Sequence, residues 1–381
     1  MEFQLSPEQD AFAKVVRDFA EAEVRPHAET WDRDHTFPVD LVHKMGELGL
    51  FGLVAPAEYG GADADFTTLC LAIEELGRVD QSVGITLSAG VGLGINPILT
   101  FGTAEQKARW LPDLVTGKAL GAFGLTEPDG GSDAGATRTR AERRDGQFVL
   151  NGEKAFITNC GTPITSVVTA TARTSPTDVS AVVVPSGTPG MIIQPPYRKL
   201  GWHASDTHGI TFADCAVPDD HLLGVEGAGF KQFLAILDDG RIAIAALAVG
   251  LAQACLEESV AYAKTRNAFG GPIGRYQGIA FQCADLEVMV ETARLVTYKA
   301  AWLKDMGRPF KQAAAIAKLH SSEAAVTATR MATQIFGGMG FMDETPVARF
   351  YRDAKILEIG EGTSEVQRLV LARGLGLPVE R

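Results

Sequence analysis

A glutamate near the C-terminus, Glu361, stands where a carboxylate could act as a general base. It lies between Gly360 and Gly362, directly before a segment that is predicted to begin a helix. Backbone at such a break can project a side chain into a cleft, and a positioned carboxylate can remove a proton from a reacting carbon. The alternative is a carboxylate that caps the following helix, which is the commoner role for a single Glu at a helix start.

Two glycine-rich segments could bring backbone close to a ligand. Residues 123–133 read FGLTEPDGGSD and combine a Pro/Gly turn with the hydroxyls of Thr126 and Ser132, a combination that suits a phosphate or a flat heterocycle. Residues 334–341 read QIFGGMGF and follow a long predicted helix. Glycines allow close approach of a ligand, but they also end helices and make turns, so both structural alternatives stay open.

The elements that must position these groups begin with helices. A capping box with a following Pro opens the first helix at Ser6, and a second capping box, at Thr103, opens a helix that ends near residue 117. Apolar periodicity predicts further helices over 39–48, 66–79 and 83–100. We therefore expect an all-α N-terminal domain over residues 1–118.

Short strands follow, separated by turns and without helices between them. Period-two alternation over 136–141, a hairpin turn at Asp145-Gly146, and Val/Thr-rich runs predict strands at 136–141, 148–150, 166–172, 179–184 and 209–212. This pattern indicates a central antiparallel β barrel or sandwich over residues 119–226.

The helical period returns after residue 227. Long amphipathic segments predict a C-terminal four-helix bundle over residues 227–381, with helices near 228–264, 277–306, 311–336, 345–357 and 363–373. The expected fold class is therefore multidomain α+β.

Composition excludes several classes of function. A formal net charge of −12 argues against nucleic-acid binding. The longest apolar run, 242–252, is too short to span a bilayer, and the acidic N-terminus has no signal-peptide pattern, so we expect no membrane partner and a cytoplasmic location.

The seven histidines and five cysteines have no metal-ligand spacing, so no metal is expected. Neither the glycines of 90–94 nor the near-elbow at 130–134 has the context of a nucleotide fingerprint or a hydrolase nucleophile.

Several motifs along nearly the whole chain resemble the acyl-CoA dehydrogenase family, in the family's order. They are LTEPDGGSD (125–133), AFITN (155–159), KLGWHASDT (199–207), GRIAIAA (240–246), TRNAFG (265–270), QIFGGMGF (334–341) and EGTSEVQR (361–368). The chain looks most similar to short-chain and short/branched-chain members. The resemblance implies the acyl-CoA dehydrogenase fold and FAD as cofactor.

The resemblance also implies a set of FAD-binding residues. The flavin and its ribityl-phosphate end would meet Phe123, Leu125, Thr126, Gly131 and Ser132, and the ring would be covered by Phe156, Ile157 and Thr158. The ADP half would be bound from the neighbouring subunit by Arg266, Phe269, Gln277, Gln334, Gly337 and Gly338, with Thr363 and Glu365 near the adenine. A cofactor shared between chains implies a homodimer, usually paired into a tetramer.

For the substrate, the resemblance implies Ser132, Asp238 and Arg241 near the CoA moiety, and Gly360 and Gly362 beside the acyl group. Glu361 matches the catalytic base. Some relatives carry the base at the position of Gly240, where glycine cannot serve. The expected reaction is α,β-dehydrogenation of an acyl-CoA to the trans-2-enoyl-CoA, with electrons passed to an electron-transfer flavoprotein.

One residue departs from the family pattern. Most relatives with this motif have Tyr before the catalytic Glu, where this chain has Gly360, and the loss of that ring predicts a wider acyl pocket for branched, cyclic or bulky groups. Alternatives are an acyl-CoA oxidase or flavin monooxygenase on the same fold, and a non-catalytic acyl-CoA-binding subunit. Physiological operation in the reductive direction also stays open, because the same residues serve both directions.

Overall fold

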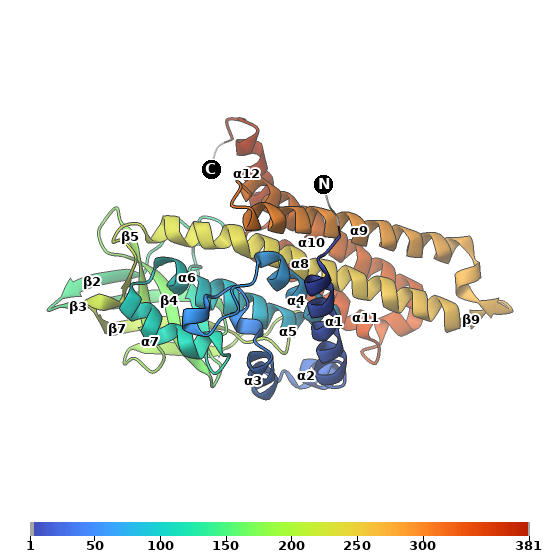
Figure 1. The fold of residues 1–381 in the computed structure, drawn as a ribbon, viewed down its shortest axis with the longest axis horizontal. Helices are drawn as coiled ribbons and strands as arrows, with labels where there is room; N and C mark the ends of the chain where they lie inside the picture. The colour runs from blue at the N-terminus through green and yellow to red at the C-terminus, as the bar shows by residue number, and fades with distance from the viewer. Residues whose placement is uncertain (1–3, 380–381) are drawn as a thin grey trace.

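The first part of the chain is all-helical in the computed structural model, which describes residues 4–379 (Figure 1). Its helices and helical turns are α1 (Pro7–Phe19), η1 (Ala20–Val24), α2 (Ala28–Asp34), α3 (Val39–Glu47), η2 (Leu50–Gly52), η3 (Ala57–Tyr59), α4 (Phe66–Val79), α5 (Gln81–Ala89), η4 (Gly90–Ile95), α6 (Asn96–Phe101) and α7 (Ala104–Val115). Both predicted capping boxes are confirmed, at Ser6 before α1 and at Thr103 before α7. Each pairs two of the amides that a helix start leaves unbonded.

Two of the three glycines of 90–94 let this helical segment pack closely against its neighbours. They form η4, where a β-carbon on Gly94 would lie 2.8 Å from the backbone oxygen of Gly121 and one on Gly90 would lie 2.6 Å from the Phe51 ring. By length and composition alone, Gln81–Phe101 could cross a membrane, but 72% of its most apolar window is buried inside the protein. It is therefore placed as a core element of the helical part.

The middle part is a β-sheet structure at one end of the molecule (Figure 1). Its strands are β1 (Leu120–Gly124), β2 (Arg140–Arg144), β3 (Gln147–Thr158), β4 (Thr165–Arg173), β5 (Val179–Pro185), β6 (Met191–Pro196), β7 (Thr207–Pro218) and, after η5 (Asp219–His221), β8 (Leu222–Leu223). The strand order is β6-β7-β3-β2-β4-β5-β8, with β1 beside β4. β2 meets β4 only at Arg140 and Arg173, and side chains from both halves of the sheet share one core.

Two details of the predicted strands are corrected. Residues 136–139 alternate between buried and exposed positions but are not a strand. The N–H groups of Arg138 and Thr139 donate to the buried carboxylate of Glu127, at 2.6 and 3.1 Å, instead of to a neighbouring strand. In addition, β1 pairs with β4 in parallel, whereas the sheet was expected to be antiparallel throughout. The predicted hairpin turn is confirmed, with positive φ at Asp145 and Gly146.

The last part is a bundle of long helices. Its elements are α8 (Gly229–Thr265), β9 (Asn267–Ala268), β10 (Gly271–Pro272), η6 (Ile273–Arg275), α9 (Gln277–Asp305), α10 (Lys311–Phe336), η7 (Gly337–Phe341), α11 (Pro346–Ala354), η8 (Lys355–Glu358) and α12 (Ser364–Gly374). α8 packs against α9 and α10, and it also contacts α4 and β5, so it touches all three parts. Close packing of α8 on α4 requires Gly250, where a β-carbon would lie 2.3 Å from the backbone oxygen of Glu74.

Candidate active site

Glu361 lies in the turn between η8 and α12, and it is not the cap of α12. That cap is Thr363, whose side chain accepts a hydrogen bond from the N–H of Val366 at 3.3 Å. The helix-capping alternative for Glu361 is therefore wrong. Glu361 has φ 55° and Gly362 has φ 92°, and a left-handed conformation is rare for a residue other than glycine outside constrained sites.

The carboxylate of Glu361 points at the middle of α8. A β-carbon added at Gly240 would lie 1.8 Å from Glu361 Oε2, so the missing side chain at Gly240 is what admits the carboxylate. Oε2 is buried and accepts no hydrogen bond from any residue between 4 and 379. A buried oxygen without a donor is costly for stability, and such groups concentrate where chemistry is done.

Burial raises the pKa of the Glu361 carboxyl to about 7. The positive charges of Arg241 and Lys318 oppose this rise in pKa, and the negative charge of Asp239 adds to it. A carboxyl with a pKa near neutrality is matched to proton removal from a weakly acidic carbon at physiological pH. The geometry and the electrostatics therefore both favour a general base at this position.

This raised pKa predicts a pH-dependent effect on stability. Because the folded-state pKa of about 7 exceeds the ordinary 4.5, the stabilising contribution of the carboxyl is complete below 4.5 and lost as pH rises through 7. Glu361→Gln, which stays neutral, should therefore raise the Tm relative to wild type at pH 8, by about 2 °C or more, and change it less at pH 5. Calorimetry at both pH values checks this, and equal shifts at pH 5 and pH 8 would contradict it.

Asp238 and Arg241 lie one helical turn apart on α8 and form an ion pair, at 2.5 Å. Arg241 is 5% exposed, and its Nε is buried without an acceptor among residues 4–379. Burial raises the pKa of Asp238, which the positive charge of Arg241 opposes. This pair leaves one buried guanidinium nitrogen near Glu361 without an acceptor among residues 4–379.

The segment after β1 is anchored at one end and open at the other. Lys154, fully buried, donates to the Glu127 carboxylate at 2.8 Å and ties the turn to β3. Beyond this anchor Gly131 and Ser132 are exposed, and Thr126 is half-buried. Residues 127–130 do form a tight turn, but the open residues beyond it remain available to a ligand.

Three of the predicted flavin contacts have side chains inside the core. Phe123 stacks on Phe233 of α8 with ring centroids 3.9 Å apart, and Leu125 and Ile157 are also buried. The side chains of these three residues are therefore largely covered by the protein itself. By contrast, the ring of Phe156 is 65% exposed, at φ 59°, and Thr158 is half-buried.

Four of the predicted ADP contacts meet in one hollow of about 740 Å³ at the far end of α8. The hollow is lined by Tyr262, Arg266, Ala268, Phe269, Ile273, Tyr276, Ile279, Ile335, Phe336, Gly337, Gly338, Met339 and Met342. Gln277 and Gln334 are exposed but do not line it. Helix α10 ends at Gly337, so these glycines both stop the helix and border the hollow.

Thr363 and Glu365 lie in the first turn of α12, where Thr363 is the cap and Glu365 is exposed. Gly360, beside Glu361, is half-buried and has open surroundings: a β-carbon there would meet only Ile356, at 3.4 Å and beyond.

Within residues 4–379, no group of three or more His, Cys, Asp or Glu side chains could hold a metal ion.

Two supporting residues were missed from the sequence. Lys318, fully buried on α10, donates to the carbonyl oxygen of Gly362 at 2.8 Å, and Gln367, also fully buried, donates to the same oxygen at 2.9 Å. The signal for Lys318 was a lone charge on an alanine-rich helical face, since lysine is almost never fully buried without a partner.

Comparison with known proteins agrees with this geometry. The chain matches the N-terminal, middle and C-terminal domain families of acyl-CoA dehydrogenases over residues 6–118, 122–215 and 227–376. It is 50% identical to a probable acyl-CoA dehydrogenase of Bacillus subtilis, YngJ, over 98% of this chain and 100% of that one. It is 46% identical to the mouse mitochondrial short-chain specific acyl-CoA dehydrogenase, over 94% of this chain and 88% of that one.

The fold is also similar to that of a solved relative. The structure of butyryl-CoA dehydrogenase from Megasphaera elsdenii superposes with a TM-score of 0.96 at 42% identity, over 98% of this chain and 100% of that one. Sequence, domain order and fold therefore agree along the whole chain. The protein belongs to the acyl-CoA dehydrogenase family.

Proposed function

We propose that this acyl-CoA dehydrogenase uses FAD to oxidise a short, branched or bulky acyl-CoA to its trans-2-enoyl-CoA, with Glu361 as the base. The observation that carries the proposal is the carboxylate of Glu361, buried against Gly240 with one oxygen unbonded. The two relatives named for short acyl chains support a short-chain substrate. An electron-transfer flavoprotein is proposed as the electron acceptor, on the family resemblance.

The residues present fit FAD. The hollow at the end of α8 combines aromatic rings, glycine backbone and Arg266, which makes no ion pair among residues 4–379. A free guanidinium beside aromatic and glycine surfaces suits a nucleotide diphosphate. The exposed ring of Phe156 and the hydroxyls of Thr126 and Ser132 suit a flat heterocycle with a polyol chain. When bound, FAD would supply the two-electron acceptor of the reaction.

The chain's own residues would then remove the proton and stabilise the charge on the carbonyl oxygen. Glu361 would remove a proton from the carbon next to the thioester carbonyl, and the developing negative charge on the carbonyl oxygen needs donors. The backbone N–H of Glu361 donates to no acceptor among residues 4–379, so it is available as one such donor. Base and donor on the same residue are fixed together by the left-handed turn.

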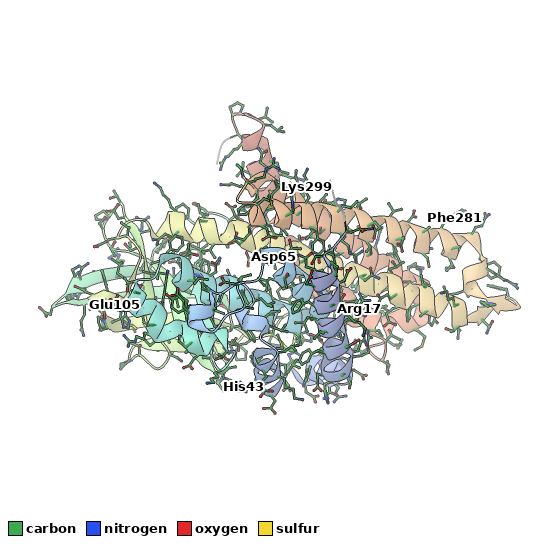
Figure 2. The ribbon with its side chains drawn as sticks, in the orientation of Figure 1. Arg17, His43, Asp65, Glu105, Phe281 and Lys299 are labelled. Atoms are coloured by element: carbon green, nitrogen blue, oxygen red, sulfur yellow. The ribbon has the colours of Figure 1, made fainter. Side chains whose placement is uncertain are left out.

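Two copies of the chain are proposed to share each cofactor. The hollow near β9 and the sheet that carries Phe156 lie at opposite ends of the molecule (Figure 1). Both halves of the proposed site can serve one dinucleotide only if they come from two chains. On α9 an exposed apolar stripe with seven-residue spacing, Phe281, Val288, Leu295 and Trp302, supports further pairing, and Figure 2 shows Phe281 on the outer side of the helix.

A soluble, cytoplasmic enzyme fits the burial of Gln81–Phe101 in the core. The acidic net charge of −12 also favours solubility. The proposed domains are residues 1–118, 119–226 and 227–381, the last two meeting near Ala228, which lies directly before α8.

Gly360→Tyr should shift acyl selectivity toward straight short chains. The open surroundings of Gly360 leave space beside the base, and a phenol ring would fill it. We expect kcat/KM for a branched or cyclic acyl-CoA to fall about 10-fold or more relative to butyryl-CoA, because one misfit group in an apolar pocket changes binding by about 1–3 kcal/mol.

The comparison needs a control that adds bulk to the same turn outside the pocket. Ile359→Tyr adds a phenol ring at the neighbouring position, which is 49% exposed, and should leave the ratio of the two kcat/KM values unchanged. An unchanged ratio in Gly360→Tyr would mean that the space at Gly360 does not hold the acyl group.

The decisive test is anaerobic bleaching of the flavin by a panel of straight, branched, cyclic and dicarboxylic acyl-CoAs. Fast bleaching by one class identifies the substrate, and no bleaching by any class would contradict the proposal. Rapid oxygen consumption by the reduced enzyme would favour an acyl-CoA oxidase or a flavin monooxygenase. A protein that stays colourless with added FAD would favour a non-catalytic acyl-CoA-binding subunit.

A further inference from the structure

Lys318 is a fully buried lysine in the first third of α10, on a face of small side chains. Its neighbours one turn away on either side are Ala314, Ala315, Ser321 and Ser322, all buried. Among residues 4–379 the Nζ atom donates to a single acceptor, the carbonyl oxygen of Gly362, at 2.8 Å. Removing an ammonium group from water costs several kcal/mol, and one neutral acceptor does not offset that cost. Lys318 is therefore a poor contributor to stability, which points to a different role.

The carbonyl that Lys318 binds belongs to the turn that aims the base. Glu361 and Gly362 both have positive φ, and Gly362 accepts from Lys318 on α10 and from Gln367 on α12. Two donors on one carbonyl fix the plane of the Gly362–Thr363 peptide, and thus the end of the left-handed turn. The direction of the Glu361 side chain toward Gly240 depends on this turn.

Lys318 also brings a positive charge to the side of Glu361. The two groups interact electrostatically, and each moves the pKa of the other toward the charged form, although burial moves the pKa of Lys318 down to about 8 and that of Glu361 up to about 7. Lys318 and Arg241 are thus the cations that keep the buried carboxylate ionisable near neutral pH.

We propose that Lys318 is a positioning residue for catalysis: from α10 it holds the Glu361–Gly362 turn and supplies a buried positive charge that stabilises the carboxylate of the base. This inference rests on Glu361 being the base. It adds a residue outside the EGTSEVQR motif, 43 positions before Glu361 in the sequence.

The other charges around Glu361 come from each element packed against it. Arg241 and Asp239 on α8 and Lys318 on α10 act directly on Glu361. Glu358 on η8 and Glu365 on α12 act on Lys318, Lys311 on α10 acts on Asp238, and Lys304 on α9 pairs with Asp239. Asp239 is paired with Lys304 at 2.8 Å and Asp238 with Arg241, so both carboxylates are partly neutralised by partners of their own. Lys318 has no carboxylate within salt-bridge distance among residues 4–379, and of the carboxylates whose charge acts on it, that of Glu361 acts most strongly.

The test compares Lys318→Met with Gln367→Met in the holoenzyme. Both substitutions remove one donor from the Gly362 carbonyl and nearly keep the volume of the side chain. Gln367→Met also removes a long hydrogen bond to the carbonyl oxygen of Glu361, at 3.4 Å, but only Lys318→Met removes a charge. The limb of the kcat/KM–pH profile that reports the base should move to higher pH by about one unit in Lys318→Met and stay in place in Gln367→Met. At pH 7 this shift alone lowers kcat/KM about fivefold.

Two readouts do not depend on turnover. The infrared band of the Glu361 carboxyl, isolated as the difference from Glu361→Gln, should titrate at higher pH in Lys318→Met. The Tm of Lys318→Met should equal or exceed that of wild type, because an apolar side chain replaces a buried charge. Lys318→Gln, which keeps a polar head group, carries the same pH expectation and serves if the Met variant does not fold.

An unmoved carboxyl band and pH limb in Lys318→Met would overturn the inference. The same shift in Gln367→Met would also overturn it, because the effect would then come from the turn and not from the charge. Failure of the proposed base gives a different result. In that case Glu361→Gln would keep its turnover, independently of the result for the Lys318 variants.

Discussion

Glu361→Gln is expected to lower turnover with the best thioester by a factor on the order of 10²–10⁴, while the protein stays yellow. The amide has the size of the carboxyl group and fits the same space against Gly240, but it cannot accept a proton. Binding of substrate and cofactor should change little, because the substitution removes no bulk and no helix cap. Stopped-flow flavin reduction with a dye acceptor measures the loss directly.

A matched control lies three residues earlier. Glu358 is half-buried at the end of η8 and is paired with Lys355. It reaches the base only through its charge on Lys318, so Glu358→Gln should retain most of the wild-type turnover. If Glu361→Gln kept both its flavin and a near wild-type rate, the base would have to be sought elsewhere. If both variants lost activity together, the cause would be the turn and not the carboxylate.

Much of the fold was predictable because it depends on local signals. The capping boxes at Ser6 and Thr103 and the long apolar periods of α8, α9 and α10 each follow from neighbouring residues. The errors came from contacts that are distant in sequence. The alternation of 136–139 predicts a strand, but the amides of Arg138 and Thr139 bind the carboxylate of Glu127, a tertiary partner that the alternation does not reveal.

The parallel pairing of β1 with β4 has the same origin. Gly121 is paired with Val167, more than forty residues later, and no local pattern fixes the relative direction of two such strands. The family resemblance gave the fold class without this detail, because it rests on motifs and not on strand register.

The site was predictable where a motif carried it and was missed where packing carried it. Glu361 stands in a glycine-flanked break that can be seen in the sequence. By contrast, the role of Gly240 depends on which turn of α8 faces Glu361, and only the three-dimensional structure supplies that pairing. The stripe of Phe281, Val288, Leu295 and Trp302 could have been found from its seven-residue spacing, but that spacing predicts a buried face, and only the structure shows that the stripe is exposed.

Gly240→Ala is expected to have the second-largest effect, although it adds one methyl group to a helix. In a helix interior this change by itself should stabilise the fold by roughly 0.5–1 kcal/mol. Here the new β-carbon would lie 1.8 Å from Oε2 of Glu361, so the carboxylate must move by an ångström or more. A base displaced by about 1 Å can cost on the order of 10²-fold in rate, and we expect kcat to fall by about that factor.

The matching control is Gly278→Ala on α9, where a β-carbon would meet nothing within 4 Å, and it should leave kcat unchanged. Gly240→Ala should keep its flavin and its KM within a few-fold, because the methyl group displaces the base and not the binding surfaces. Undiminished kcat would mean that the catalytic position of Glu361 lies away from α8, and that the contact with Gly240 belongs only to a resting conformation. A lower kcat with an unchanged or raised Tm would instead separate the position of the base from the stability of the fold, which is the distinction that the close contact between Gly240 and Glu361 predicts.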